Sequence, residues 1–333
     1  MARDLETTSP SHGGGAKKLA FFAAKLFVTG ACFWYLSRQI DLSQVLSAIP
    51  LMDFRWAAFA ISIVVLQLPL LGLRWRNVVD ALAACDDRMT RTVMISITAI
   101  GVFFGQVLPS VAGEGVRAWM LARISRDWRN AVMSVIIDRG VGVGLLLALG
   151  FAILLLPSGL TALGGYRAIV VGSYGSLLLA SACCLLLAPR IAPLLARWRY
   201  SRWLAALAID SREVVLGRNG PAILTIGCLI HVLTIAVIWS LGRAQGLMLP
   251  VTDTAVLFTV MIGVAIVPIS VGGWGLRELA VISLLGNYGI APGRALLFSV
   301  CFGLVLAIGS LPGALAWLLY AFAPSWRTAE RSG

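Results

Sequence analysis

Ser110–Arg117 reads SVAGEGVR, and Ser270–Arg277 reads SVGGWGLR. The two stretches align without a gap at an offset of 160 residues, and Ser, Val, two of the glycines and the Arg are identical. Pro109 precedes the first stretch, and Pro268 lies just before the second. Each stretch interrupts an apolar segment with glycines and then adds charge. This pair of charged breaks is the starting point for the fold prediction.

The composition indicates a membrane protein. The chain has 333 residues, of which 59% are hydrophobic and 13% are charged, and its mean hydropathy is +0.90. A soluble domain of this size carries roughly 25% charged residues. Alternation with a period of two is absent, which disfavours a β-barrel. We therefore predict an all-α polytopic membrane protein.

Eight hydrophobic regions follow one another along the chain. The third and the seventh are the ones that contain the Gly-rich breaks. The regions cover 19–36, 57–73, 93–112, 131–156, 168–188, 222–241, 254–286 and 295–322.

The net charge of +12 comes mainly from arginines in short loops, so it predicts topology rather than nucleic-acid binding. Loops rich in Arg face the cytoplasm under the positive-inside rule. These are 74–92, 118–130 and 189–220, together with both terminal tails. The loops with few basic residues face outward and are 37–56, 157–167, 242–253 and 287–294.

This assignment gives region 93–112 two cytoplasmic ends and region 254–286 two outer ends. We therefore predict six full spans plus two re-entrant broken helices, with both termini in the cytoplasm. Eight ordinary spans is the alternative, which hydropathy does not exclude. Residues 1–18 are expected to be a disordered tail, 19–322 a single transmembrane domain and 323–333 a second tail.

The spacing of the spans indicates an internal repeat. The region 57–73 corresponds to 222–241, and 131–156 corresponds to 295–322. The first half, 19–156, starts inside, and the second half, 168–322, starts outside on the loop charges. This is an inverted-topology repeat, a plan in which broken helices place a substrate site near the midplane. A chance likeness between two Gly-rich turns is the alternative.

Glu114, Arg117, Arg277 and Glu278 are the first candidate site residues. Glycines permit unwound backbone there, and a helix starting just after each cluster would place its Arg in the first turn. Amide donors with a guanidinium fork suit a lipid phosphate. In the alternative interpretation, Glu114 pairs with Arg117 and Arg277 with Glu278 simply to lock the backbone. The glycines are Gly113, Gly115, Gly272, Gly273 and Gly275.

Asp138 and Arg139 are the next candidates, because they lie about seven residues into the apolar run 131–156. Ionisable groups at that depth are costly and point to function, although a plain ion pair near the interface fits equally well. His231 stands alone in an apolar helix and is better explained as a packed histidine.

No catalytic or metal-binding signature is visible. The six cysteines show no CxxC or Cys/His spacing, so we expect no metal site and no disulfide. No Walker loop, HExxH or GxSxG occurs. We expect no cofactor and no catalytic residue.

Three segments together resemble the lysylphosphatidylglycerol synthetase/flippase transmembrane-domain family. They are Pro109–Arg117, the pair Asp138-Arg139, and Pro268–Glu278 (PISVGGWGLRE). Asp138 stands where the family usually has Glu, and Ala112 stands where a bulkier or basic residue is common. The resemblance covers nearly the whole chain. It implies translocation of a phospholipid or lipid-linked molecule across the bacterial inner membrane, without the soluble synthetase domain of two-domain members.

The resulting functional hypothesis is a lipid translocase in which Arg117 and Arg277 engage a lipid phosphate from the two leaflets. Glu114, Glu278 and Asp138 would balance charge or bind a cationic headgroup. A membrane-embedded transferase on a lipid-linked substrate and an accessory subunit of a lipid-synthesis complex are the alternatives. The expected partners are membrane lipids, and a second copy of the chain or lipid-biosynthesis enzymes are further candidates.

Overall fold

The computed structural model describes residues 52–82, 89–107, 111–156, 163–198, 201–266 and 275–322, and this part of the chain is helical with no strand. The predicted region 19–36 and the glycines Gly272 and Gly273 lie outside the described residues. The helices are α3 (Phe54–Ala81), α4 (Arg91–Val107), α5 (Val111–Ser125), α6 (Trp128–Leu154), η2 (Gly164–Tyr166), α8 (Arg167–Ala196), α9 (Arg202–Leu216), α10 (Gly220–Ala244), α11 (Val251–Ile266), α12 (Leu276–Gly286), α13 (Pro292–Gly309) and α14 (Leu311–Phe322).

Five stretches of the described chain are long and apolar enough to cross a membrane. They are α3, α6, α8 with η2, α10, and α13 with α14. Each coincides with one of the predicted full spans, and their multi-pass helical pattern is that of a membrane protein. The helices α4 and α11 are apolar but shorter. At about 1.5 Å per residue they reach about 25 Å, less than the roughly 30 Å of hydrocarbon in a bilayer.

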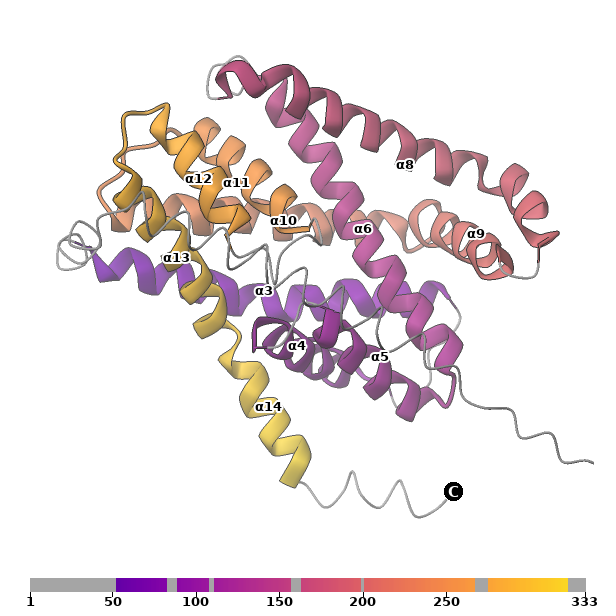
Figure 1. The fold of residues 1–333 in the computed structure, drawn as a ribbon. Helices are drawn as coiled ribbons and strands as arrows, with labels where there is room; N and C mark the ends of the chain where they lie inside the picture. Colours follow the sequence, from indigo (N-terminus) through magenta and orange to yellow (C-terminus); the bar gives the residue numbers. More distant parts are fainter. Residues whose placement is uncertain are drawn as a thin grey trace, which may run out of the picture.

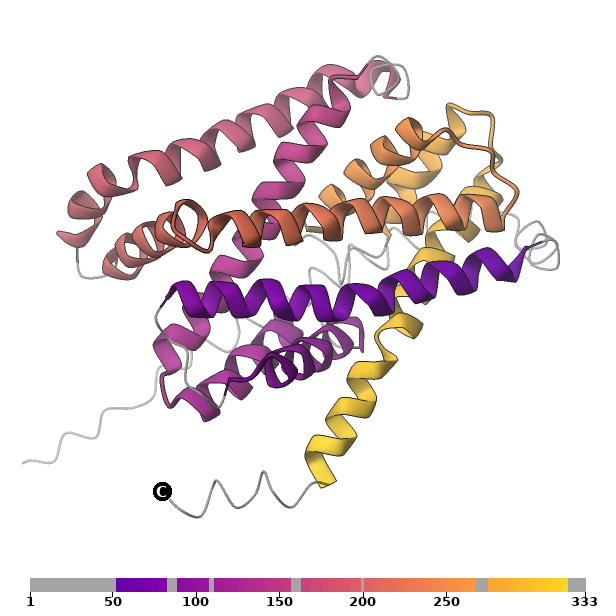
Figure 2. The same ribbon diagram turned by 180° about the vertical axis from the view of Figure 1, so that it is seen from behind.

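Helices α3 and α10 form an antiparallel pair that runs lengthwise through the molecule (Figure 2). At one end, the backbone N–H of Asp53 donates to the carbonyl of Ala244 at 2.8 Å. At the other end, the side-chain amide of Asn219 donates to the carbonyl of Asn77 at 3.2 Å. We refer to these as the Asp53 end and the Asn77 end of the bundle.

Helices α4 and α5 pack together as a hairpin whose outer ends both lie at the Asn77 end. In the chain, the hairpin comes between α3, which ends at the Asn77 end, and α6. Helix α6 starts at the same end, as the hydrogen bond from Trp75 of α3 to Ser134 of α6 at 3.2 Å shows. A Cβ on Gly113 would collide with the carbonyl oxygen of Gly101, so the two helices touch backbone to backbone. Glycine is what permits this crossing.

Helices α11 and α12 also pack together, and their outer ends lie at the Asp53 end. They stand between the last residue of α10 and the first turn of α13. The end of α10 and the start of α13 are in direct contact, since the Arg294 guanidinium donates to the carbonyl of Gln245 at 2.6 Å. The residues that connect α11 to α12, 267–274, lie outside the described part.

The order of packing is the same in the two halves. In the first half, each of the helices α3 to α6 packs on the next one, and in the second half each of α10 to α13 does the same. Between the halves, α13 contacts α3 and α6 contacts α10. Each hairpin has its own apolar core. One core surrounds α4 and α5 and includes Trp75 and Leu121, and the other surrounds α11 and α12 and includes Phe258 and Val281. Helices α4 and α11 begin 160 positions apart.

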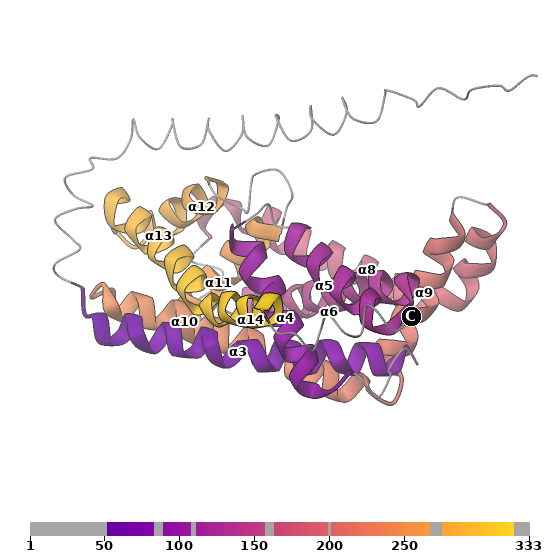
Figure 3. The ribbon, with the colours of Figure 1, turned by 90° about the horizontal axis from the view of Figure 1, so that it is seen from below.

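Three helices lie at the periphery. Figure 1 shows α8 along one edge, where it packs on α6 and α9. Helix α9 lies within the segment 189–220, which the loop charges predict to be a cytoplasmic loop. Helix α14 projects beyond the bundle after a break at Ser310 (Figure 1). It lies beside α4 (Figure 3), and its Gly313 packs on Ala99 of that helix.

Two sequence-based expectations are wrong in detail. Helix α5 begins at Val111, so Gly113 and Gly115 lie inside the helix rather than in unwound backbone, and Arg117 lies beyond the first turn. The close crossing with α4 explains Gly113 better than backbone freedom does. The apolar region 57–73 also continues as helix to Ala81, which places Arg74 inside α3 rather than in a loop.

Candidate functional site

Asp138 is the centre of a buried ionic cluster between α3, α5 and α6. One carboxylate oxygen accepts from the Arg74 Nε at 2.9 Å, and the other accepts from an Arg117 terminal nitrogen at 2.9 Å. A second nitrogen of Arg74 donates to the backbone carbonyl of Asp138 at 3.4 Å. The Asp138 side chain is 2% exposed. Two guanidiniums therefore fix one carboxylate that has been removed from solvent.

The Arg117 side chain reaches Asp138 because the neighbouring residues leave space for it. A Cβ on Gly101 of α4 would overlap the Cγ and Cδ atoms of Arg117. The lack of a side chain at position 101 therefore leaves the space that Arg117 occupies. The Arg117 guanidinium lies 4.3 Å from the centre of the Trp75 ring, a cation–π contact. Trp75 is fully buried and is oriented by its hydrogen bond to Ser134.

Glu114 and Arg139 form the outer edge of the cluster. One carboxylate oxygen of Glu114 accepts from Arg117 at 2.8 Å, and the other accepts from Arg139 at 3.5 Å. The side chains of Glu114 and Arg139 are 25% and 57% exposed. We call the five residues Arg74, Glu114, Arg117, Asp138 and Arg139 the Asp138 cluster. It contains three arginines and two carboxylates, and its formal charge is therefore +1.

A second cluster lies between α12 and α13. Glu278 accepts from the Nε and a terminal nitrogen of Arg277 at 3.1 and 2.6 Å, and from the hydroxyl of Ser299 at 2.9 Å. The Nε of Arg277 also donates to Ser299 at 3.1 Å. The remaining Glu278 oxygen accepts from the backbone N–H of Gly275, which has a φ of +86° that favours glycine. We call Arg277, Glu278 and Ser299 the Glu278 cluster.

The two clusters occupy corresponding places in the chain. Arg117 and Arg277 are 160 positions apart, and each bonds a residue on the next long helix, Asp138 or Ser299. Their charges differ. The Glu278 cluster is neutral and fully buried, and the Asp138 cluster is positive and open at the Glu114–Arg139 edge.

All six sequence-predicted charged residues fall in these clusters. The structure joins Glu114, Arg117, Asp138 and Arg139 in one cluster and Arg277 with Glu278 in the other. It therefore contains the local pairs Glu114–Arg117 and Arg277–Glu278 that the backbone-locking interpretation expected. Arg277 is in the first turn of α12, as predicted.

Sequence reasoning missed Arg74, Trp75 and Ser299. Arg74 is separated from Asp138 by 64 residues, and it was assigned to a cytoplasmic loop because it ends an apolar run. Its position directly beside Trp75 at the end of that run is the only signal that the sequence offers. Ser299 resembles any serine in an apolar helix.

His231 and the described cysteines have structural explanations. The Nε2 of His231 lies 3.1 Å from the carbonyl of Gly142, as expected of a packed histidine. The described cysteines, Cys183, Cys184, Cys228 and Cys301, are free thiols. Among the described residues no three His, Cys, Asp or Glu side chains come together as a metal site would require.

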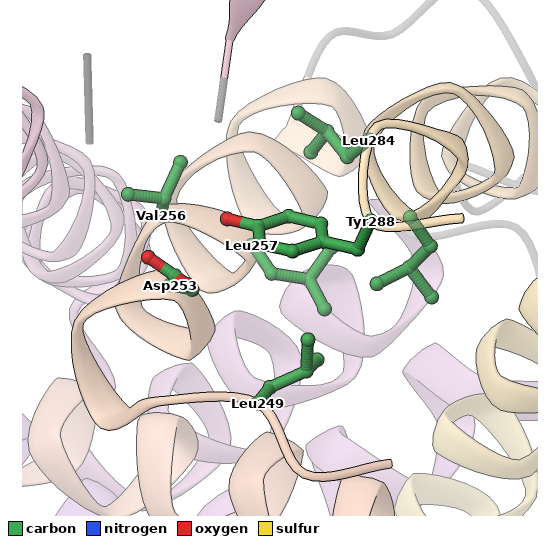
Figure 4. Close-up of a pocket in the computed structure, with 7 residues that line it drawn as sticks. Leu249, Asp253, Val256, Leu257, Leu284 and Tyr288 are labelled. Carbon is green, nitrogen blue, oxygen red and sulfur yellow. The ribbon is translucent and has the colours of Figure 1, made fainter. Parts of the chain in front are cut away.

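A small pocket lies at the Asp53 end between α11 and α12. Figure 4 shows the hydroxyl of Tyr288 directed toward the carboxylate of Asp253, with apolar side chains around the pair. This hydrogen bond, the nearby negative charge and, above all, partial burial raise the pKa of Tyr288 to about 12. The pair ties the second residue after α12 to the first turn of α11. The lining residues are Leu249, Asp253, Val256, Leu257, Leu284, Leu285 and Tyr288.

The fold and the clusters define a multi-pass helical membrane protein with charged residues buried at two related places. The family model described as the Lysylphosphatidylglycerol synthase TM region matches residues 22–313, which include both clusters. The chain therefore belongs to this family, which confirms the resemblance found in the sequence. A comparison with curated proteins found no match.

Proposed function

We propose that the protein is a lipid translocase that moves a phospholipid or lipid-linked molecule across the bacterial inner membrane. The observation that carries the proposal is the pair of buried ionic clusters, one beside each helical hairpin. Buried charges in membrane segments are costly and occur where substrates or ions pass. Membership of a family with a lipid-related membrane role supports the same conclusion.

The two halves are proposed to form an inverted-topology repeat. Equivalent helices α3 and α10 run antiparallel, and the hairpins α4–α5 and α11–α12 have their outer ends at opposite ends of the bundle. This is the arrangement that alternating access needs, because one hairpin faces each side. Both hairpins are then re-entrant, the Asn77 end is cytoplasmic, and the two termini are cytoplasmic.

The arginines of the clusters are the proposed contacts to the lipid headgroup. In this structure Arg117 and Arg277 each donate to carboxylates. Headgroup binding therefore requires that a phosphate replace a carboxylate partner, or that a cationic headgroup share one. Guanidiniums suit this exchange, because their planar fork binds carboxylate and phosphate in the same geometry.

The transferase alternative is less well supported by the same geometry. It needs a free general base, and both oxygens of the Asp138 carboxylate are occupied by guanidiniums. Glu114 is the remaining candidate and is itself shared between two arginines. We propose that the membrane domain transports rather than catalyses.

Transport can be tested with the purified chain in proteoliposomes that contain fluorescent phosphatidylglycerol, with dithionite to quench label in the outer leaflet. Movement of label beyond that in protein-free vesicles is expected. An Arg117→Lys/Arg277→Lys variant keeps the charges but loses the fork, and it should slow movement at least about tenfold. Arg190→Gln on the exposed face of α8 is the control. Equal rates in the double variant and the wild type would remove the roles proposed for the two arginines.

Topology can be tested separately by thiol labelling in a cysteine-free background. Met248→Cys follows α10 at the Asp53 end, and Arg129→Cys lies in the first turn of α6 at the Asn77 end; both positions are exposed. Impermeant maleimide added to intact cells should label position 248 and leave position 129 unlabelled until the cells are opened. Labelling of both from outside would contradict the proposed orientation.

A further inference from the structure

Arg139 is an exposed cation at a depth where exposed cations are rare. It lies eight residues after residue 131, where the apolar run of α6 begins, or about 12 Å along the helix. That distance is well inside a bilayer whose hydrocarbon is about 30 Å thick. Its side chain is nevertheless 57% exposed. A guanidinium in this position needs water or an anion beside it.

The surface beside Arg139 is open. Cβ atoms built on Gly140 of α6 and Gly115 of α5 would meet nothing within 4 Å among the described residues. These two glycines are the immediate chain neighbours of Arg139 and Glu114. An incoming group can therefore approach the Glu114–Arg139 edge over bare backbone.

Glu114 is held in the way that a bound anion would be. Its two carboxylate oxygens accept from two different arginines, Arg117 at 2.8 Å and Arg139 at 3.5 Å. The contact to Arg139 is at the limit of a hydrogen bond, so that guanidinium is incompletely neutralised. The cluster as a whole keeps one uncompensated positive charge.

We infer that the Glu114 carboxylate occupies the place of a phosphate group and that the phosphate of a membrane lipid binds between Arg117 and Arg139 by displacing it. The displaced carboxylate moves toward the open space beside Gly115. Two phosphate oxygens then take the donors that Glu114 gives up, and Asp138 stays bonded to Arg74 and Arg117. This inference rests on the proposed function, since it names the group that this cluster recognises.

The inference predicts opposite effects for two neighbouring variants. Arg139→Gln removes a donor to the phosphate and should weaken its binding about tenfold. Glu114→Gln removes the competing carboxylate and should strengthen binding by a similar factor. A purely structural role for the pair would weaken binding in both variants or in neither. Arg129→Gln, an exposed arginine near the start of the same helix, is the matched control and should bind as the wild type does.

Binding can be measured by calorimetric titration of the purified full chain in nonionic detergent with dihexanoyl-phosphatidylglycerol. Dihexanoylglycerol, which lacks the phosphate, and inorganic phosphate, which lacks the lipid, are titrated in parallel. Saturable binding of the phosphatidylglycerol alone is expected. Equal binding of dihexanoylglycerol would overturn phosphate recognition, and equal binding of inorganic phosphate would overturn a lipid as the source.

The outcomes separate this inference from the translocase proposal. Unchanged affinity in Arg139→Gln, or weaker binding in Glu114→Gln, overturns the displacement mechanism even when transport is observed. Arg139-dependent binding without movement of label in proteoliposomes supports the phosphate site and refutes the translocase. The unfolding temperature of each variant without lipid shows that it is folded.

Discussion

Replacement of Asp138 by Asn should destabilise the protein strongly while leaving its shape almost unchanged. The Asn side chain keeps one oxygen of similar position but carries no charge. That oxygen can accept from only one of the two arginines; without it, Arg74 keeps the backbone carbonyl of residue 138 and Arg117 keeps Glu114. The formal charge of the cluster rises from +1 to +2 in a place that is closed to solvent.

The size of the effect follows from burial. Removing one partner of a buried ion pair costs about 3–5 kcal/mol, because the other charge is left uncompensated. Asp138 is 2% exposed and pairs with two arginines, so the full range applies. Glu114 is 25% exposed, and Arg117 keeps Asp138 when it is neutralised. Glu114→Gln should therefore cost only about 1 kcal/mol.

The two variants can be compared by reversible unfolding with sodium dodecyl sulfate in mixed micelles, with tryptophan fluorescence as the probe. Adding Arg74→Met to Asp138→Asn returns the cluster to a charge of +1 and should recover part of the lost stability. The double variant would then be more stable than the sum of the single changes predicts. A cost for Asp138→Asn no greater than that for Glu114→Gln would refute the reasoning.

Three further changes test other contacts. Gly113→Ala should cost about 1–3 kcal/mol in thermal unfolding, because its Cβ would collide with the carbonyl of Gly101, whereas Gly115→Ala points into open space and should stabilise α5 by up to about 1 kcal/mol. Ser299→Ala should cost about 1–2 kcal/mol through the lost bond to the buried Glu278, while Ser62→Ala on the exposed face of α3 should cost almost nothing. Tyr288 keeps its proton to about pH 12 in the folded state and loses it near its usual value of 10 when unfolded, so stability falls as pH rises through that window. Tyr288→Phe should remove this part of the fall, measured as the difference in unfolding free energy between about pH 9 and about pH 11.

The sequence predicts the class of protein and most of its helices because membrane insertion imposes a strong and local constraint. A segment must be long, apolar and helical to cross, and α3, α6, α8, α10 and α13–α14 each satisfy this over their own residues. The charged candidates were found for a related reason. Glu114, Asp138 and Glu278 stand out because few acidic residues occur in or beside such segments.

The missing parts depend on contacts between distant segments. Arg74 binds Asp138 only because α3 packs against α6, and its neighbour Trp75 does not indicate which residue it will meet. Gly113 was interpreted through its backbone freedom, whereas its value lies in the absent Cβ where α5 crosses α4. Local rules cannot distinguish these two uses of glycine, since both need the same residue.

The difference between the clusters bears on how a two-sided carrier would work. Arg117 bonds Asp138 on the next long helix, whereas Arg277 bonds Ser299 on its next long helix, so the second arginine meets a hydroxyl there and the first meets a carboxylate. Glu278 is fully buried, whereas Glu114 is partly exposed, so only the first cluster is reachable in this structure. In the proposed alternating access, a second conformation must open the Glu278 cluster to the opposite side of the membrane. In that conformation Arg277 would release the carboxylate of Glu278, its neighbour in the sequence. Arg277 and Glu278 are neighbours on one helix and form a neutral pair that Ser299 of α13 completes, whereas Arg117 needs α3 and α6 in place. We therefore expect the first cluster to determine which headgroup binds and the second to act mainly as a seal.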